Sequence, residues 1–147
     1  MRKIFRMLAV AFTLAAAGAA TSAVTSARAD VLAQISISQQ TMTVYVDGFP
    51  RYTWPVSTAR APYATPRGTF RPQRLERSWY SRVYNNAPMP YAIFFHYGFA
   101  VHGTNQTRAL GRPASHGCVR LPTSAARELF MLVKQHGMKN SRIVVGI

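Results

Sequence analysis

The chain has 147 residues and carries 18 Lys and Arg against four Asp and Glu, a formal net charge of +14 at pH 7. This length fits one domain with a sizeable core, and the single cysteine excludes an intramolecular disulfide. The charge favours an anionic partner, such as nucleic acid, wall polymer or lipid head groups.

Residues 1–29 have the pattern of a cleavable export signal. Three basic residues among the first six precede an uncharged, Ala-rich stretch, and the A-x-A sequence at 27–29 stands before Asp30. An uncleaved membrane anchor is the alternative, but a spanning helix needs about 20 strongly apolar residues and this stretch is short and rich in Ala, Gly and Thr. We therefore expect a signal peptide over 1–29 and one exported domain over 30–147, without stable membrane insertion.

Export decides between the anionic partners. Four of the 18 basic residues precede the cleavage site and all four acids follow it, so the exported 118 residues keep a net charge of about +10. Twelve of the remaining 14 basic residues are Arg, whose planar guanidinium suits carboxylates and phosphates. We therefore expect envelope material rather than nucleic acid as the partner. Separately, we expect the protein to be a monomer.

The first half of the exported chain reads as antiparallel β structure. Apolar residues alternate with polar ones from Val31 to Val56, and Asp47-Gly48 is typical of a tight hairpin turn. Residues 58–70 contain two prolines and a glycine, which predicts a turn or loop region that leads into Thr69-Phe70. Residues 71–90 follow neither period, and they are either a functional lid or an irregular wall of the fold.

The second half contains the remaining regular elements. The apolar run 91–104 predicts two buried strands joined by a turn at Tyr97-Gly98, with His102 ending the second strand on the face opposite Val101. Residues 105–114 are a loop, 123–136 have a helical period that stops at Gly137, and 142–147 read as a strand. About seven strands and one helix indicate an all-β sandwich or barrel that carries one helix.

The lone Cys118 lies within "PASHGCVRLP" (113–122) and is either a buried hydrophobe, half of an intermolecular bridge or a reactive thiol. A cysteine nucleophile needs a base, a group that orients the base and donors for an oxyanion. His102 is the favoured base because His116, two residues from Cys118 on an extended segment, points the same way without facing it. An imidazolium partner would lower the thiol pKa, so we expect a thiolate–imidazolium pair near neutral pH.

Neighbouring residues fit the same chemistry. Gly117 lets the backbone approach a substrate and frees nearby amides as donors, and Arg120 leans to the side of Cys118, where it would hold a carboxylate. A zinc site of His102, His116 and Cys118 is disfavoured because none of the four carboxylates stands beside them and no H-E-x-x-H is present. His96 is expected to be a core or turn residue and His136 a surface residue that complements the helix dipole.

Two spaced motifs carry a family resemblance. "HGT" (102–104) and "SHGCVR" (115–120) resemble the signature of the YkuD-type L,D-transpeptidases, and "VST" (56–58), "TPRGTF" (65–70) and "MPYAIFFHYGFAVHGT" (89–104) resemble its leading motifs. The resemblance covers roughly 31–147. The chain departs from the family at Ala59-Arg60, where Gly is usual, a change expected to alter a turn without touching a catalytic position.

The resemblance implies a mainly β fold, a sandwich of mixed sheets with one helix near the C-terminus and a lid-like loop. It also implies a carbapenem-sensitive wall enzyme without cofactor or metal. Cys118 would attack a tetrapeptide stem, the terminal D-alanine would leave, and an amine from another stem or from an envelope protein would resolve the thioester. The implied residues are Cys118, His102 and the Gly103 carbonyl for catalysis; Ser115, His116 and Gly117 for the pocket and oxyanion; and Arg120, Thr104 and Tyr91 for substrate.

Two other functions remain open from the sequence. An L,D-carboxypeptidase of the same fold would pass the acyl group to water instead of an amine. A noncatalytic basic module would bind the wall, or nucleic acid, without using the thiol.

Overall fold

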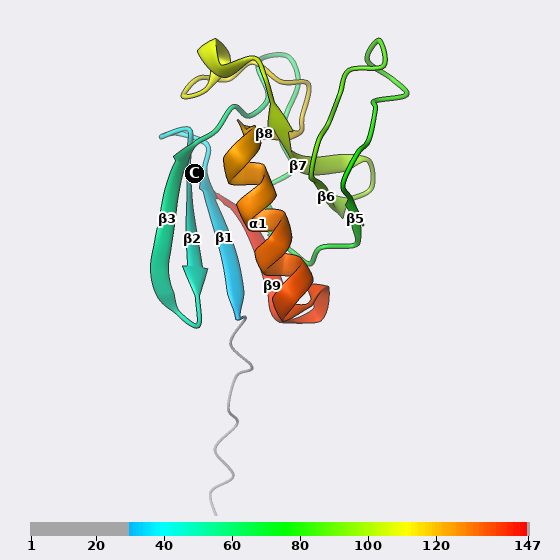
Figure 1. The fold of residues 1–147 in the computed structure, drawn as a ribbon. Helices are drawn as coiled ribbons and strands as arrows, with labels where there is room; N and C mark the ends of the chain where they lie inside the picture. Colours follow the sequence, from blue (N-terminus) through cyan, green and yellow to red (C-terminus); the bar gives the residue numbers. More distant parts are fainter. Residues whose placement is uncertain (1–29, 147) are drawn as a thin grey trace, which may run out of the picture.

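Nine β-strands, one α-helix and two short 3-10 helices make up residues 30–146, the part of the chain that the computed structural model describes (Figure 1). The predicted signal peptide, residues 1–29, lies outside the described residues, as does position 147. Within residues 30–146 no helix is long and apolar enough to cross a membrane. The elements are β1 (Val31–Ser36), β2 (Thr41–Val46), β3 (Phe49–Pro55), β4 (Gly68–Phe70), β5 (Arg74–Glu76), β6 (Ala92–His96), β7 (Phe99–Thr104), η1 (Thr107–Ala109), β8 (Val119–Pro122), α1 (Thr123–His136), η2 (Met138–Asn140) and β9 (Ser141–Gly146).

The first sheet has the strand order β3-β2-β1-β9-β4. The predicted hairpin joins β2 to β3: Asp47 and Gly48 have φ values of 51° and 84°, the positive pair that a type I′ turn requires. β1 also pairs with β9, in parallel, which brings the end of the chain back to the centre of the sheet. The sheet is therefore mixed, as the resemblance implied.

The second sheet has the order β5-β6-β7-β8 and carries the motif residues. β6 and β7 are the two buried strands predicted from the apolar run, and β8 adds to β7 in parallel. The chain after β3 connects the two sheets, because the Ser57 amide donates to the Arg120 carbonyl and the Arg120 amide donates back to Ser57.

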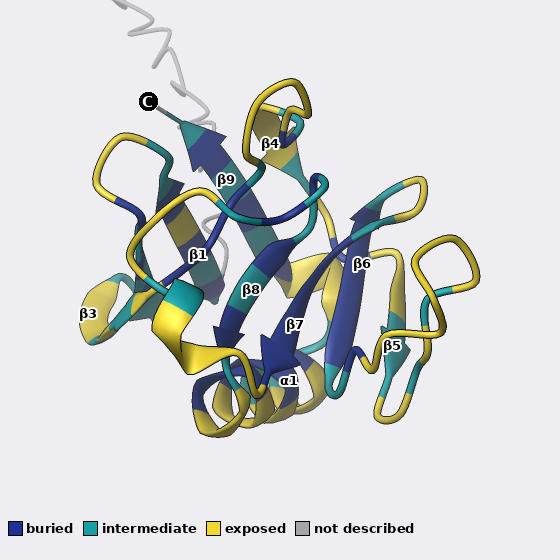
Figure 2. Ribbon diagram, turned by 90° about the horizontal axis from the view of Figure 1, so that it is seen from above, coloured by how far each residue is buried: buried dark blue, intermediate teal, exposed yellow. Residues whose placement is uncertain are grey.

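One apolar core fills the space between the sheets and the helix. Strand residues of alternating burial such as Val44 and Val101 meet Leu129 and Val133, which recur at helical spacing on α1. Figure 2 shows β6 and β7 almost entirely buried and β8 alternating between buried and intermediate residues, whereas α1 keeps an exposed outer face. Burial of these side chains stabilises the motif-bearing strands by about 1.5–3 kcal/mol for each large apolar residue.

The structure confirms the fold class and refines several predictions. The helix begins and ends where the period predicted, and Gly137 follows it with a φ of 93°. The strands number nine in the described residues rather than about seven, since neither β5, which has only three residues, nor β8, which follows the cysteine motif, is among the predicted strands. β7 also continues past His102 to Thr104, since its parallel pairing with β8 extends to Pro122.

Candidate active site

Cys118 and His102 line the same cavity, of about 1060 Å³, which opens between the ends of β7 and β8 and the segment 79–89. That segment belongs to the stretch 71–90, which divides into strand β5 and a loop that rises beside β6 (Figure 1). Trp79, Tyr84 and Met89 from it line the cavity. The loop therefore forms one wall of the site, the position expected of a lid-like segment.

The pairing of β7 with β8 explains why these side chains share the cavity. Val101 pairs with Val119 and His102 pairs with Arg120. Side chains alternate between the faces of a sheet, so the two valines point into the core, where both are almost completely buried, while His102 and Arg120 point to the other face. Cys118, two residues before Arg120, lies on that same face against Ala100.

His102 is held in the tautomer that a general base requires. Its Nδ1 lies 2.7 Å from the Gly103 carbonyl oxygen, which can only accept, so Nδ1 carries the proton and Nε2 keeps its lone pair. Burial lowers the pKa of His102 to about 4, partly opposed by the Gly103 hydrogen bond and assisted by the Arg120 charge. A side chain at 103 would approach the Thr123 backbone to 3.0 Å, so glycine permits this close packing.

The Cys118 thiol is mostly buried, and its polar contact is with the Ala100 amide, 3.4 Å from Sγ. Burial raises its pKa, and the Ala100 amide and the Arg120 charge partly oppose that rise. Among the described residues no hydrogen bond joins the thiol to the His102 ring. Both pKa shifts are opposite to those expected of the predicted thiolate–imidazolium pair, because burial disfavours both charges.

A serine organises the turn that presents the thiol. The buried Ser115 hydroxyl donates to the Cys118 carbonyl (2.6 Å) and accepts from the Gly117 amide (3.0 Å). The Gly117 amide is thus engaged within the turn, which leaves the Cys118 amide as the better-placed oxyanion donor of the two. Gly117 has a φ of 138°, and a Cβ there would overlap the Phe99 ring, so the turn requires glycine.

The segment 56–60 supports this turn from its other side. The Ser115 amide donates to the Thr58 carbonyl at 2.9 Å, and the Arg60 amide donates to the Ser115 carbonyl at 3.0 Å. Thr58 is itself fixed by Gln40, whose side-chain amide bonds both its backbone N–H (2.9 Å) and its hydroxyl (2.6 Å). The "VST" motif therefore acts as a backbone support for the cysteine turn.

His116 is enclosed by groups from two other segments of the chain. Tyr84 stacks on its ring at 4.3 Å, Tyr63 meets it edge-on at 4.7 Å, and Arg60 Nη2 donates to its Nε2 at 2.9 Å. Burial and the charges of Arg60 and Arg120 lower the pKa of His116. Arg60, at the departure from the family pattern, lines the cavity and contacts His116, but it forms no hydrogen bond to Cys118, His102 or Gly103 among the described residues.

The residues expected to bind substrate are only partly brought together. Arg120 and Thr104 line the cavity, and Arg120 Nη1 donates to Gln106 Oε1 at 3.3 Å. Tyr91 lies elsewhere: its ring packs edge-on against Phe130 of α1, 5.7 Å between centroids, and it does not line the cavity. Tyr91 has a φ of 54° and stands just before β6, so the role that the resemblance implied for it finds no support in its position.

The other two histidines also lie outside the cavity. His96 ends β6 and contacts the rings of Phe70, Tyr97 and Phe99, as expected of a core or turn histidine. His136 is the last residue of α1. Neither therefore competes with His102 as the base.

The sequence did not predict the contacts that surround His116 or the hydrogen bond between Arg120 and Gln106. Arg60, Tyr63 and Tyr84 stand at irregular positions where no period indicates a direction. The one available signal was the departure from the family pattern at position 60.

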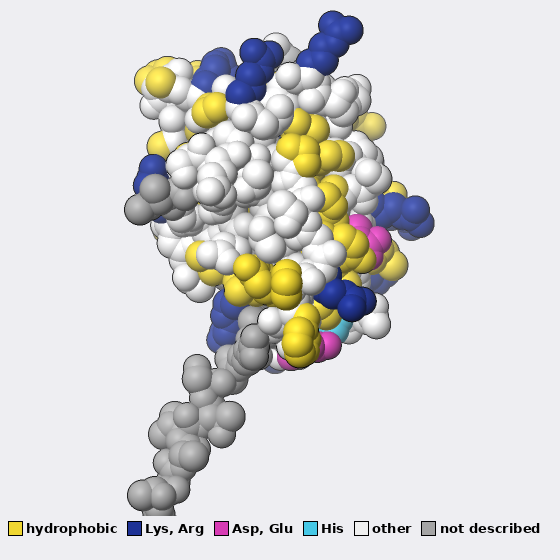
Figure 3. Space-filling model, turned by 90° about the vertical axis from the view of Figure 1, so that its left-hand side faces the viewer, with side chains coloured by type: hydrophobic (Ala, Val, Ile, Leu, Met, Phe, Trp, Pro, Cys, Tyr) yellow, Lys and Arg dark blue, Asp and Glu magenta, His cyan; other side chains and the backbone are white. Residues whose placement is uncertain are grey.

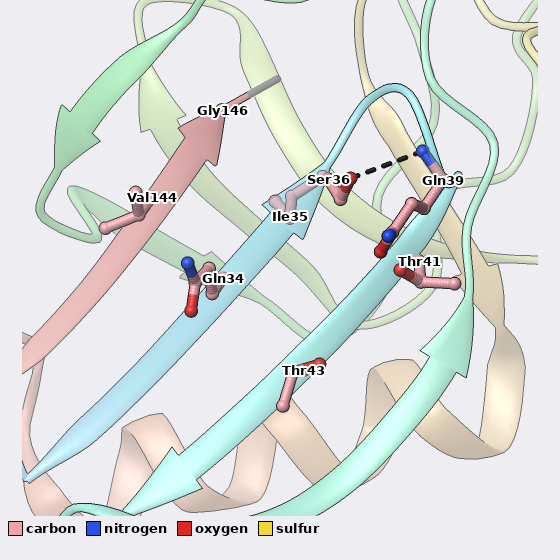
Figure 4. Close-up of a pocket in the computed structure, with 8 residues that line it drawn as sticks. All are labelled: Gln34, Ile35, Ser36, Gln39, Thr41, Thr43, Val144 and Gly146. Atoms are coloured by element: carbon pink, nitrogen blue, oxygen red, sulfur yellow. Dashed lines mark hydrogen bonds between the residues drawn. The ribbon is translucent and has the colours of Figure 1, made fainter.

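Two further features bear on the chemistry. In residues 30–146 no three His, Cys, Asp or Glu side chains gather into a metal site. A second cavity, of about 280 Å³, lies on the face of the first sheet formed by β1, β2 and β9 (Figure 4). Its lining is neutral, and there the backbone N–H of Gln39 donates to the Ser36 hydroxyl. Its described lining contains hydroxyls but no thiol, no histidine and no charged group that could activate them, so the larger cavity is the candidate active site.

Comparison with known families agrees with this geometry. The family model of the YkuD L,D-transpeptidase catalytic domain matches residues 30–145. The chain belongs to this family. It is 27% identical over 105 residues to the YkuD protein of Bacillus subtilis (strain 168), which covers 67% of the chain and 58% of that protein.

Solved structures show the same fold. An L,D-transpeptidase from Mycobacterium tuberculosis H37Rv has a TM-score of 0.72 and 26% identity over 80% of the chain and 58% of its own length. L,D-transpeptidase 3 from Mycobacterium tuberculosis, in complex with a faropenem-derived adduct, has a TM-score of 0.70 and 24% identity over 80% of the chain and 60% of its own. This YkuD-family chain thus spans less than two thirds of the length of these relatives.

Proposed function

We propose that this protein is an exported L,D-transpeptidase that uses Cys118 as nucleophile and His102 as general base on peptidoglycan stem peptides. The observation that carries the proposal is the parallel pairing of β7 and β8, which puts thiol and imidazole on one face of the sheet inside one cavity. Family membership supports the reaction class. The neutral, Nδ1-protonated imidazole supports the role of His102 as base.

The neutral ground state favours proton transfer coupled to attack. As Cys118 Sγ bonds to the carbonyl carbon of the L-centre, His102 Nε2 takes the thiol proton, and the Cys118 amide donates to the oxyanion. Collapse of the tetrahedral intermediate breaks the peptide bond, and the imidazolium returns the proton to the leaving D-alanine amine. The product of this half-reaction is a thioester on Cys118.

The second half-reaction repeats these steps with an acceptor. An amine attacks the thioester carbonyl, His102 Nε2 takes its proton, and the cysteine sulfur leaves and recovers a proton from the imidazolium. The Gly103 carbonyl stabilises the ring orientation throughout, at the place where serine proteases use Asp. Arg120, on the same face as Cys118, holds a stem carboxylate.

Export follows from the predicted leader and fits the charge of the surface. Lys and Arg side chains stand around the margin of the face seen in Figure 3, as expected of a protein that works against an anionic wall. We propose that residues 1–29 direct the domain to the envelope, where a stem amine or an envelope protein serves as acceptor.

Intact mass spectrometry of the purified protein with a carbapenem tests the nucleophile. We expect a stoichiometric adduct on Cys118 that is lost in Cys118→Ala and falls sharply in His102→Ala. A protein that never labels is a binding module instead.

Incubation with tetrapeptide fragments of the wall then identifies the acceptor. Cross-linked dimers identify a transpeptidase, whereas tripeptide alone identifies an L,D-carboxypeptidase. Wild type and Cys118→Ala are compared under the same conditions, since only chemistry at the thiol is lost in the variant.

A further inference from the structure

The cavity that contains Cys118 is lined by four arginines and, among the described residues, by no Asp or Glu. Two of these arginines are occupied elsewhere. Arg74 is paired with Glu76 at 2.9 Å and lies over the rings of Trp79 and Phe94. Arg82 lies over the ring of Trp79, 5.3 Å from its centroid. Arg60 and Arg120 are left as the charges that face the site.

These two guanidinium groups lie close enough to affect each other. Both line one cavity, and Arg60 contacts His116 at 2.9 Å. Burial lowers the pKa of Arg120, which Cys118 partly opposes and the charge of Arg60 assists; burial and the charges of both arginines lower the pKa of His116. In the part of the chain that the structure describes, neither has a carboxylate partner, since the one ion pair there is that of Arg74. Like charges held together without a counter-charge repel, and an anion bound between them relieves that repulsion.

Both groups also keep free donors. Arg60 uses Nη1 for the Ala114 carbonyl (3.1 Å) and Nη2 for His116 (2.9 Å), and Arg120 uses Nη1 for Gln106 (3.3 Å). A guanidinium has five N–H groups, so each retains several for a ligand while the existing bonds hold it in place. Backbone pairing of Arg60 with Ser115, and of Arg120 with Ser57, holds the two segments that carry these arginines against each other.

We propose that Arg60 and Arg120 form a two-arginine clamp that selects acyl donors with two free carboxylates over donors in which the second carboxylate is an amide. Arg120 shares a sheet face with Cys118, so it receives the carboxylate of the leaving residue. Arg60 lies beyond His116 and receives the second carboxylate, farther from the scissile bond. This inference rests on the proposed acyl-transfer function and names its donor class.

A pair of synthetic tetrapeptide donors that differ only in that carboxylate or amide tests the clamp. For the wild type we expect kcat/KM to be about tenfold higher for the two-carboxylate donor, a difference that decreases with added salt. Arg60→Met should remove most of this preference, and Arg60→Lys should keep part of it because charge remains without the fork. Arg82→Met is the matched control, since it removes one cavity charge outside the clamp and should affect both donors by one common factor.

Binding to the inactive Cys118→Ala variant, measured by calorimetry with the same two donors, separates the clamp from the reaction. Tighter binding of the two-carboxylate donor that Arg60→Met abolishes supports the clamp, even if the wild type turns over neither donor and the proposed function fails. Equal kcat/KM for both donors in an active wild type overturns the clamp and leaves the function standing. An equal loss of kcat/KM for both donors in Arg60→Met would mean that Arg60 only positions His116, which overturns the clamp. An Arg82→Met variant that loses the donor preference as fully as Arg60→Met would mean that the positive charge of the whole cavity selects the donor, which also overturns the clamp.

Discussion

Acidification should destabilise the fold through His102. The imidazole has a pKa of about 4 in the folded protein and about 6.5 when exposed, so between these values the unfolded chain binds the extra proton. Stability therefore decreases as the pH falls from 6.5 towards 4. The lost free energy of unfolding is about 2 kcal/mol at pH 5 and about 3 kcal/mol at pH 4 relative to neutral pH.

Urea unfolding at pH 7, 6, 5 and 4, followed by circular dichroism, measures this loss. The matched variant His102→Gln lacks the titrating ring. Its free energy of unfolding should therefore fall less than that of the wild type on acidification, by about 2 kcal/mol at pH 5 and about 3 kcal/mol at pH 4. Because both proteins contain the other histidines, including the more accessible His116, the contributions of those residues to the pH dependence cancel in the comparison. A proton NMR titration of the His102 ring gives the pKa directly.

Equal pH slopes in wild type and His102→Gln would refute the reasoning. So would a His102 titration midpoint at or above 6.5, because it would mean that burial does not disfavour the imidazolium; a midpoint above 7 would make the ring mostly an imidazolium at neutral pH. The proposed proton transfer from a neutral thiol would then also have to be replaced.

Three further perturbations test the thiol and its turn. Iodoacetamide alkylation of Cys118 as a function of pH should have a midpoint above that of a free thiol, about 8.5, and a midpoint below 8 would contradict this. Arg120→Met should raise the midpoint further because the Arg120 charge favours the thiolate, and an unchanged midpoint in the variant would contradict that. Gly117→Ala should cost about 1–3 kcal/mol in urea unfolding and abolish carbapenem labelling, since it strains the backbone and displaces Phe99; normal labelling would speak against this. Ser115→Ala should cost about 1–3 kcal/mol and slow labelling, whereas an unchanged labelling rate would show that the hydroxyl does not organise the turn.

The place of His102 on the cavity face of its strand was predictable from the sequence because strand alternation is a strong local rule. His102 stands one position from a buried valine in an apolar strand, so its side chain must leave the core. The helix over 123–136 and the hairpin at Asp47-Gly48 are local in the same sense, since periodicity and turn chemistry need no partner elsewhere in the chain.

The ionisation of the site and its arginine pair depended on tertiary structure. Sequence spacing places an imidazole near a thiol, but only the packing of β7 against β8 shows that both groups are buried enough to stay neutral. Arg60 reaches the cavity through backbone pairing between segments 55 residues apart, Arg60 with Ser115, and no local pattern carries that information. Periodicity reports the direction of a side chain within its own element, whereas burial and charge proximity are properties of the assembled fold.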